Sequence, residues 1–227
     1  MRIARESIAA RGRFTVALAG GNTPRLTYEL LATRFRDDID WTRVVIVFGD
    51  ERFVPPDDAR SNYRMAREAL LARVPIPAES IHAVPTDAPS VSDAARAYDD
   101  TLQRVLAGAP DNETVDVALL GVGPDGHTAS LFPGMPGLED DTRWALPVGV
   151  PTTVQPAVER VSVSLPFLNA ARIAMFLVAG KDKRPVVGEI LEAAPSARHY
   201  PAARVAARER TLWLIDRSAM PDDRPNA

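Results

Sequence analysis

One histidine stands in a loop whose composition suits proton transfer. His127 follows Asp125 and Gly126 in the segment LGVGPDGHTASLFPG at positions 120–134. The unperturbed pKa of a histidine is about 6.5, so His127 could take a proton from water near neutral pH. Asp125 could hold the imidazole tautomer, a role equally open to Asp50. The alternative is a structural histidine that bonds a backbone carbonyl.

A second loop is suited to an anion. Gly20, Gly21, Asn22 and Thr23 precede Pro24, between a predicted strand and a predicted helix. Glycines let the backbone approach a ligand closely, and the N–H groups at a helix start favour phosphate. The Thr23 hydroxyl could add a hydrogen bond. A plain tight turn is the alternative.

A third loop is charged. Asp50, Glu51 and Arg52 follow the predicted strand 44–48. Arg52 could clamp an anion with its guanidinium fork, and Asp50 could orient a partner or act as a base. Three consecutive charges are also typical of a solvated loop. Ser61 and Asn62 begin the next predicted helix, either as caps or as residues that close the site.

Other chemistries fit the sequence poorly. Gly121 to Gly126 matches G-x-G-x-x-G, but Pro133 stops the long helix that a dinucleotide site needs, so we expect no nicotinamide cofactor. The three histidines lack paired spacing and cysteine is absent, so we expect no metal site. No G-x-S-x-G serine elbow is present. The predicted cofactor requirement is therefore none.

The elements that must position these loops alternate between strands and helices. Short apolar runs predict strands at 14–19, 44–48, 81–84, 115–120, 144–148, 161–165, 173–178 and 211–215, and helical patterns occupy 24–35, 92–106, 185–193 and a segment from about 61. This order predicts an α/β fold, a Rossmann-like and mostly parallel sheet with helices on both faces. Ligands bind such sheets beyond the carboxyl ends of the strands, where all three loops fall.

Composition limits the partners. The chain has 227 residues and a net charge of -3, which favours one domain over 1–227 and argues against a nucleic-acid or acidic-membrane partner. The absence of cysteine and of a long apolar run predicts a cytoplasmic protein. We expect the last ten or so residues to form a flexible tail. The sequence leaves monomer and dimer equally open.

Taken together, the loops resemble the 6-phosphogluconolactonase family. The matching segments are AGGNTP at 19–24, GDER at 49–52 with Ser61 and Asn62, GVGPDGHTASLFPG at 121–134, Arg160 to Ser162, Gly180 with Lys183, and Pro201 and Ala202 with Val205. The similarity extends from about residue 10 to the predicted strand at 211–215. Family members usually carry a further strand before the glycine loop, so an N-terminal edge strand could be lacking here.

The resemblance implies hydrolysis of 6-phospho-D-glucono-1,5-lactone to 6-phosphogluconate in the oxidative pentose phosphate pathway, on a fold shared with glucosamine-6-phosphate deaminases. The catalytic histidine of the family falls on His127. Its phosphate contacts fall on the Gly20–Thr23 loop, Arg160 and Lys183, and Arg52 matches a further substrate-binding arginine.

Two alternatives compete with a lactonase. One is a glucosamine-6-phosphate deaminase or isomerase, but the Asn-Glu of its third loop is replaced here by Leu131 and Phe132. The other is a non-catalytic sugar-phosphate sensor. This interpretation requires an attached DNA-binding module.

Overall fold

The computed structural model describes residues 1–107, 113–139, 142–152 and 154–221. The helices are α1 (Arg2–Arg11), α2 (Asn22–Arg34), α3 (Asn62–Ala66), α4 (Val91–Val105), α5 (Leu165–Asn169) and α6 (Arg184–Leu191). The strands are β1 (Phe14–Leu18), β2 (Val44–Phe48), β3 (Asp50–Arg52), β4 (Val117–Leu120), β5 (Ala145–Val148), β6 (Arg160–Val163), β7 (Ile173–Val178) and β8 (Arg210–Ile215). Part of the expected C-terminal tail, residues 222–227, lies outside the described residues.

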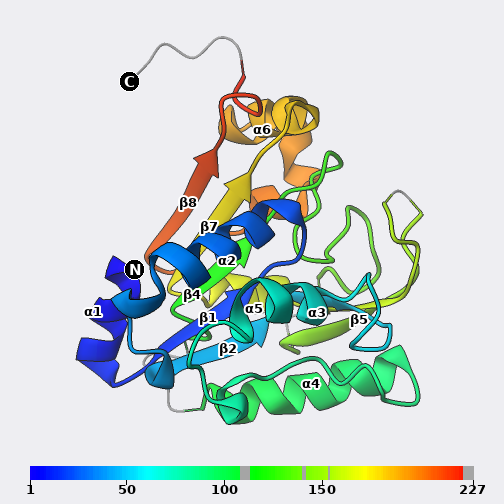
Figure 1. Cartoon of the computed structure of the whole chain (residues 1–227). Coiled ribbons are helices and arrows are strands. Elements are labelled where there is room, and N and C mark those ends of the chain that lie inside the picture. The colour runs from blue at the N-terminus through cyan, green and yellow to red at the C-terminus, as the bar shows by residue number, and fades with distance from the viewer. Residues whose placement is uncertain (108–112, 140–141, 153, 222–227) are drawn as a thin grey trace.

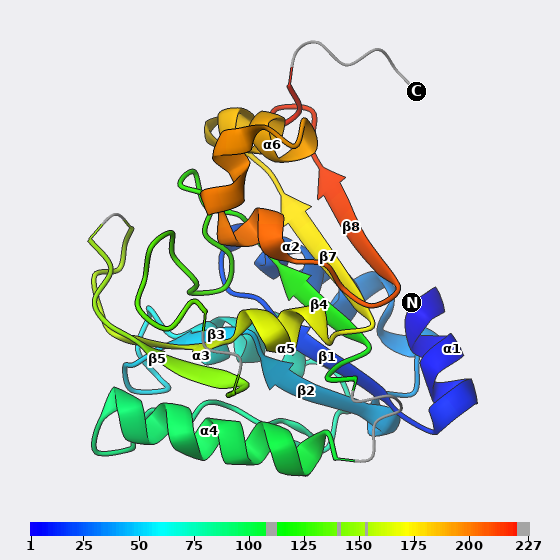
Figure 2. The same cartoon turned by 180° about the vertical axis from the view of Figure 1, so that it is seen from behind.

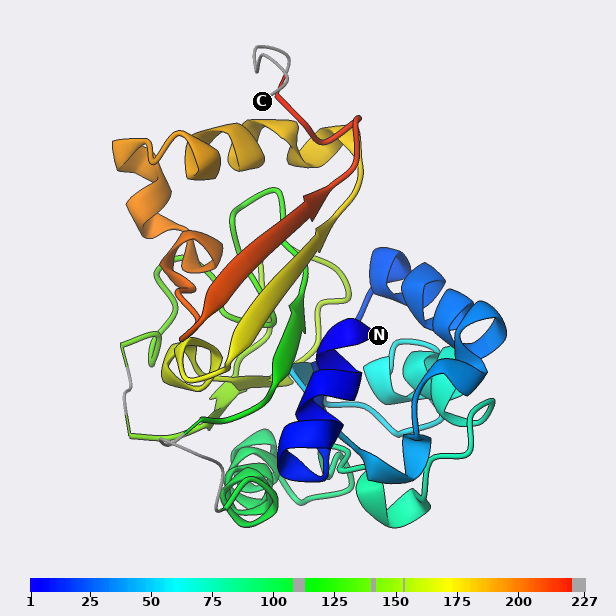
Figure 3. The same ribbon diagram turned by 90° about the vertical axis from the view of Figure 1, so that its left-hand side faces the viewer.

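The main sheet has five parallel strands in the order β2-β1-β4-β7-β8. Its strands are nearly continuous apolar runs because helices cover both faces. Figure 3 shows α1 and α2 on one side of the sheet, and α5 with the turns that precede β8 on the other. The predicted mostly parallel α/β sheet is therefore confirmed.

The chain changes direction across this sheet between β1 and β4. From β1 it passes to β2 on one side, and later enters β4 on the other. β4 pairs with β1 only at Val117 and Ala118, and continues with β7 as far as Leu120. The carboxyl ends of β1 and β4 consequently separate. A ligand crevice is expected at such a switch point.

A second, antiparallel sheet with the order β3-β6-β5 was not anticipated. The segment 50–52, predicted as loop, pairs with β6 in register from Asp50–Ser162 to Arg52–Arg160. Helix α4 lies beneath this sheet and beside β2 in both Figure 1 and Figure 2. The Asp99 carboxylate of α4 accepts hydrogen bonds from the Trp144 and Ala145 backbone N–H groups, which joins the helix to β5.

Three further expectations differ from the structure. The predicted strand 81–84 is only an isolated bridge between Ile81 and Ile46, because the Tyr98 hydroxyl bonds the backbone groups of Phe48, the next residue of β2 that could pair with this segment. The strand predicted over 161–165 ends at Val163, and α5 begins at Leu165 behind a Ser164 cap. Helix α1 was not predicted.

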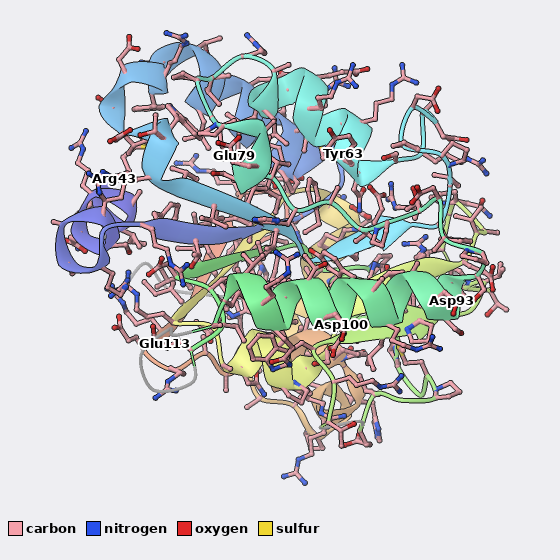
Figure 4. All side chains as sticks on the ribbon, turned by 90° about the horizontal axis from the view of Figure 1, so that it is seen from below. Arg43, Tyr63, Glu79, Asp93, Asp100 and Glu113 are labelled. Atoms are coloured by element: carbon pink, nitrogen blue, oxygen red, sulfur yellow. The ribbon has the colours of Figure 1, made fainter. Side chains whose placement is uncertain are left out.

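Helix α4 illustrates why the amphipathic helices were predicted well. Its buried residues are Val91, Ala94, Ala95, Tyr98 and Leu102, at helical spacing. The outer face of α4 carries charge, and Figure 4 shows Asp93 near its N-terminus and Asp100 in its middle. The Ser90 hydroxyl accepts a hydrogen bond from the Asp93 N–H and so caps the first turn.

Candidate active site

A cavity of about 360 Å³ lies beyond the separated ends of β1 and β4. Of the candidate residues, it is lined by Gly20, Gly21, Asn22, Thr23, Asp50, Arg52, Asn62, His127, Arg160 and Lys183. These residues come from segments as far apart as Gly20 and Lys183. The tertiary structure therefore brings together ten of the twelve candidates, leaving Asp125 and Ser61 outside the lining.

His127 is held by Asp125 directly behind it. The Asp125 Oδ1 atom lies 2.5 Å from His127 Nδ1 and also accepts the His127 backbone N–H. Burial raises the pKa of Asp125, but its hydrogen bonds and ion pairing with His127 together outweigh burial and lower that pKa to about 2. Asp125 is thus ionised at neutral pH and can only accept, so Nδ1 carries the proton and Nε2 is left as the basic atom. Asp50 does not hold this histidine.

The His127 ring is confined from two further directions. A Cβ on Gly123 would lie 2.0 Å from His127 Nδ1, so only glycine fits there. The Phe132 ring lies against the imidazole with a centroid distance of 4.8 Å. The loop is closed by a hydrogen bond from the Gly123 N–H to the His127 carbonyl and by Gly126 at φ +79°. The imidazole orientation is therefore fixed before any ligand binds.

The glycine loop presents the start of a helix to the cavity. Gly21, at φ +100°, precedes the first helical residue Asn22, and it has no side chain with which to cap the N–H groups of the first turn. Gly20 passes close to Asn62, whose Oδ1 would lie 2.0 Å from a Cβ at that position. The backbone N–H groups and the positive end of the α2 dipole thus face the cavity.

The charged run is buried, so the solvated-loop interpretation is wrong for its carboxylates. Asp50 is 7% exposed and Glu51 is 2% exposed. Asp50 accepts hydrogen bonds from the Asn62 amide and the Ser130 hydroxyl. Glu51 accepts from the backbone N–H groups of Arg52, Asn62 and Tyr63. Burial raises the pKa of Glu51, and these three bonds oppose that rise.

Arg52 and Arg160 are directly opposite each other in the β3–β6 pair. Opposed residues of antiparallel strands share a face, and like charges so placed repel. Arg160 is 3% exposed; burial lowers its pKa, Asp50 counteracts this, and Arg52 adds to it. The Nε atoms of both arginines are buried without a hydrogen-bond partner. An anion between them would relieve the repulsion and supply an acceptor.

Lys183 lines the cavity from the segment that follows β7. It ends the 3₁₀ turn Lys181–Lys183, and its Nζ lies 2.7 Å from the Asp182 carboxylate. Gly180, at φ +108°, allows the chain to turn from β7 into this segment. Lys183, Arg160 and Arg52 place three cationic side chains around one cavity.

Comparison with known proteins identifies the family. The family model for glucosamine-6-phosphate isomerases/6-phosphogluconolactonase matches residues 1–213. The chain belongs to this family.

Its relatives share most of their length with it. It is 41% identical over 216 residues to the 6-phosphogluconolactonase of Nostoc sp., covering 94% of this chain and 86% of that protein. The crystal structure of 6-phosphogluconolactonase from Thermotoga maritima aligns with a TM-score of 0.80 at 33% identity, over 94% and 90% of the two chains. A monomeric glucosamine-6-phosphate deaminase has a TM-score of 0.80 at 20% identity, over 96% and 91%, and shares the fold.

In this protein, Ser61 caps helix α3 and does not line the cavity. Its hydroxyl accepts the Arg64 N–H and donates to Glu51. Sequence reasoning missed Glu51 as a support for the site, because a run of three charges gives no sign of burial. It also missed Ser130, which is fully buried and contacts both Asp50 and Arg160. No sequence signal distinguished Ser130 from a loop serine.

We also searched the described residues for a cluster of metal-ligating side chains and for a membrane-spanning helix. In the described ranges, no group of three or more His, Cys, Asp or Glu side chains is arranged to hold a metal ion. The same residues include no helix with the length and apolar character needed to span a bilayer.

Proposed function

We propose that this chain hydrolyses 6-phospho-D-glucono-1,5-lactone to 6-phosphogluconate, with His127 as the general base. The observation that carries the proposal is the oriented Asp125–His127 pair at the edge of a cavity that three cationic side chains also line. The relatives named 6-phosphogluconolactonase support the same substrate. The lactone carbonyl is already electrophilic, so a positioned base and an anion site are sufficient chemistry.

In the first step, His127 Nε2 takes a proton from water as the water oxygen bonds to C1 of the lactone. The carbonyl electrons move to oxygen, where Arg52 or the loop N–H groups stabilise the negative charge. The bond between C1 and the ring oxygen then breaks. The His127 proton passes to that ring oxygen, which leaves as a hydroxyl. The new carboxylic acid at C1 then ionises, and its hydroxyl oxygen loses the second proton of the water.

The phosphate fixes the ring relative to the water. We assign its contacts to the Gly20–Thr23 loop, Arg160 and Lys183, which supply backbone N–H groups and two positive charges. Holding C1 at a fixed distance from the base lowers the barrier by removing translational and rotational freedom in advance. Asn62 closes the cavity beside Gly20.

The rival function is glucosamine-6-phosphate deamination. The resemblance to the deaminases implies that a glutamate of their third loop takes part in catalysis. The matching position here is Phe132. Its ring packs on His127 and cannot exchange a proton. This observation favours the lactonase. A sugar-phosphate sensor would not need the Asp125–His127 pair.

The test follows the loss of lactone generated in situ. We expect His127→Ala to lower kcat by about 100- to 10,000-fold with little change in substrate affinity, because it removes base catalysis. The matched control is His199→Ala, which removes an exposed histidine and leaves the rate unchanged. Arg160→Ala and Lys183→Ala should mainly raise KM.

A chelator-treated sample tests whether hydrolysis is independent of metal, as predicted. If the wild-type protein does not exceed the spontaneous rate, the lactonase proposal is wrong. Glucosamine-6-phosphate would then be tried as substrate.

A further inference from the structure

Two fully buried tyrosines make the same unusual contact in different parts of the sheet. The Tyr28 hydroxyl of α2 accepts the Ala19 N–H and donates to the Ala19 carbonyl, both at 2.9 Å. The Tyr98 hydroxyl of α4 accepts the Phe48 N–H at 2.6 Å and donates to the Phe48 carbonyl at 2.9 Å. Both tyrosines are 0% exposed. Each hydroxyl therefore satisfies both backbone groups of one residue.

Ala19 needs such a partner because β4 has left β1 by this point. The Leu18 carbonyl accepts the Gly49 N–H on the β2 side. Successive residues of a strand direct their backbone groups to opposite sides, so those of Ala19 face the side of β4. The last β1–β4 pair is Ala17 with Ala118. The Tyr28 hydroxyl takes the place of the missing strand.

Phe48 needs a partner because β2 is the edge strand of the main sheet. Beyond β2 there is only the isolated bridge between Ile46 and Ile81 in the described part of the chain. The backbone groups of Phe48 lie two residues further along and on the same side as those of Ile46. Tyr98 supplies the donor and acceptor there. Unpaired, these buried groups would be costly.

We infer that Tyr28 and Tyr98 are positioning residues, each holding the strand end from which one loop of the active site departs. Ala19 is followed directly by the Gly20–Thr23 loop, and Phe48 by Gly49 and β3, which carries Asp50 and Arg52. A hydroxyl bound on both sides fixes the direction in which the chain leaves the strand. The inference rests on the proposed function only for which kinetic constant each tyrosine controls.

The experiment uses Tyr28→Phe and Tyr98→Phe, which keep the buried ring and remove the hydroxyl. The matched control is Thr114→Val. It also removes one buried hydroxyl that donates to a backbone carbonyl, that of Phe167, but it precedes β4 at the opposite end of the sheet. Thermal unfolding and steady-state lactone hydrolysis are measured for all three variants.

We expect all three variants to lose thermal stability, and only the tyrosine variants to change kinetically. Tyr28→Phe should raise KM about five- to tenfold by loosening the phosphate loop, and Tyr98→Phe should lower kcat about five- to tenfold by displacing Arg52. Equal kinetics in the tyrosine variants and Thr114→Val would mean that the hydroxyls serve stability alone, and would overturn the inference.

Two measurements separate this inference from the proposed function. If the wild type does not hydrolyse the lactone, calorimetric binding of 6-phosphogluconate still compares Tyr28→Phe with Thr114→Val, and equal affinities refute the role of Tyr28. If a variant does not fold, amide hydrogen exchange of the wild type decides. The Ala19 and Phe48 amides should exchange as slowly as core strand amides, and rapid exchange would refute the inference.

Discussion

Gly123→Ala tests the general-base assignment without removing the base. Gly123 does not have positive φ, so alanine is acceptable to the backbone there. Its Cβ, however, would lie 2.0 Å from His127 Nδ1 and 2.6 Å from Asp125 Oδ1. One methyl group is thus directed at both members of the Asp125–His127 pair, while every ionisable group of the cavity remains.

The size of the effect follows from these distances. Ordinary contact with a Cβ begins at 3.4 Å. The imidazole must therefore retreat by about 1.4 Å, and a misplacement of about 1 Å costs on the order of 100-fold in rate. The retreat also breaks the 2.5 Å contact with Asp125. We expect kcat to fall about 100-fold or more, with KM nearly unchanged, because the three atoms nearest the added methyl belong to His127 and Asp125 and not to the residues to which we assign the phosphate.

The assay is steady-state lactone hydrolysis together with thermal unfolding. Gly149→Ala is the matched control, because its methyl would meet nothing within 4 Å and its φ is not positive. We expect wild-type kinetics from it. If Gly123→Ala kept the wild-type kcat, the position of His127 would not matter to the reaction and the base assignment would be refuted. A low kcat with normal unfolding and normal 6-phosphogluconate affinity would support it.

Three further outcomes are expected. Gly20→Ala should raise KM, because its Cβ would lie 2.0 Å from Asn62 Oδ1 and displace the loop; an unchanged KM would contradict this. Asp125→Asn should lower the free energy of unfolding at pH 7 by about 1 kcal/mol after allowing for screening. The folded pKa is lowered from 3.8 to about 2, so this difference from wild type is present above pH 3.8 and disappears as pH falls through about 2; denaturant titrations across that range measure it. Asp116→Ala should cost about 3 to 5 kcal/mol of stability, because the buried Asp116 carboxylate accepts from Arg11, the Ser7 hydroxyl and the Thr15 N–H, and its loss leaves these donors unpaired. Hydrolysis at temperatures where it stays folded should be normal, since Asp116 is at the opposite end of β4 from the cavity.

Much of the fold could be predicted because its signals are local. The strands 44–48 and 173–178 were predicted with their observed bounds, since short runs of β-branched and large apolar residues are typical of strands buried on both faces. For Ser61 the sequence left a helix cap and a residue that closes the site both open, and the structure shows the cap. The second sheet was not predicted, because β3 is a charged segment that becomes a strand only by pairing with β6, more than a hundred positions away.

The candidate site divides in the same way. The residue types and their positions after strands were sufficient to nominate the three loops, because parallel strands bring their carboxyl ends to one edge. What the sequence by itself determined is the kind of chemistry available: one histidine in a glycine loop, an open helix start, and basic residues without cysteine or paired histidines.

Only the tertiary structure decided which side chains contact one another. It assigned Asp125 and not Asp50 to His127, placed Arg160 opposite Arg52, and removed Ser61 from the cavity. It also buried Glu51 and Ser130 beneath the site. Contacts of this kind depend on the register of distant strands and on where β4 separates from β1. Hydrogen bonds are made over about 3 Å, and no property of the linear order fixes separations on that scale between loops a hundred residues apart.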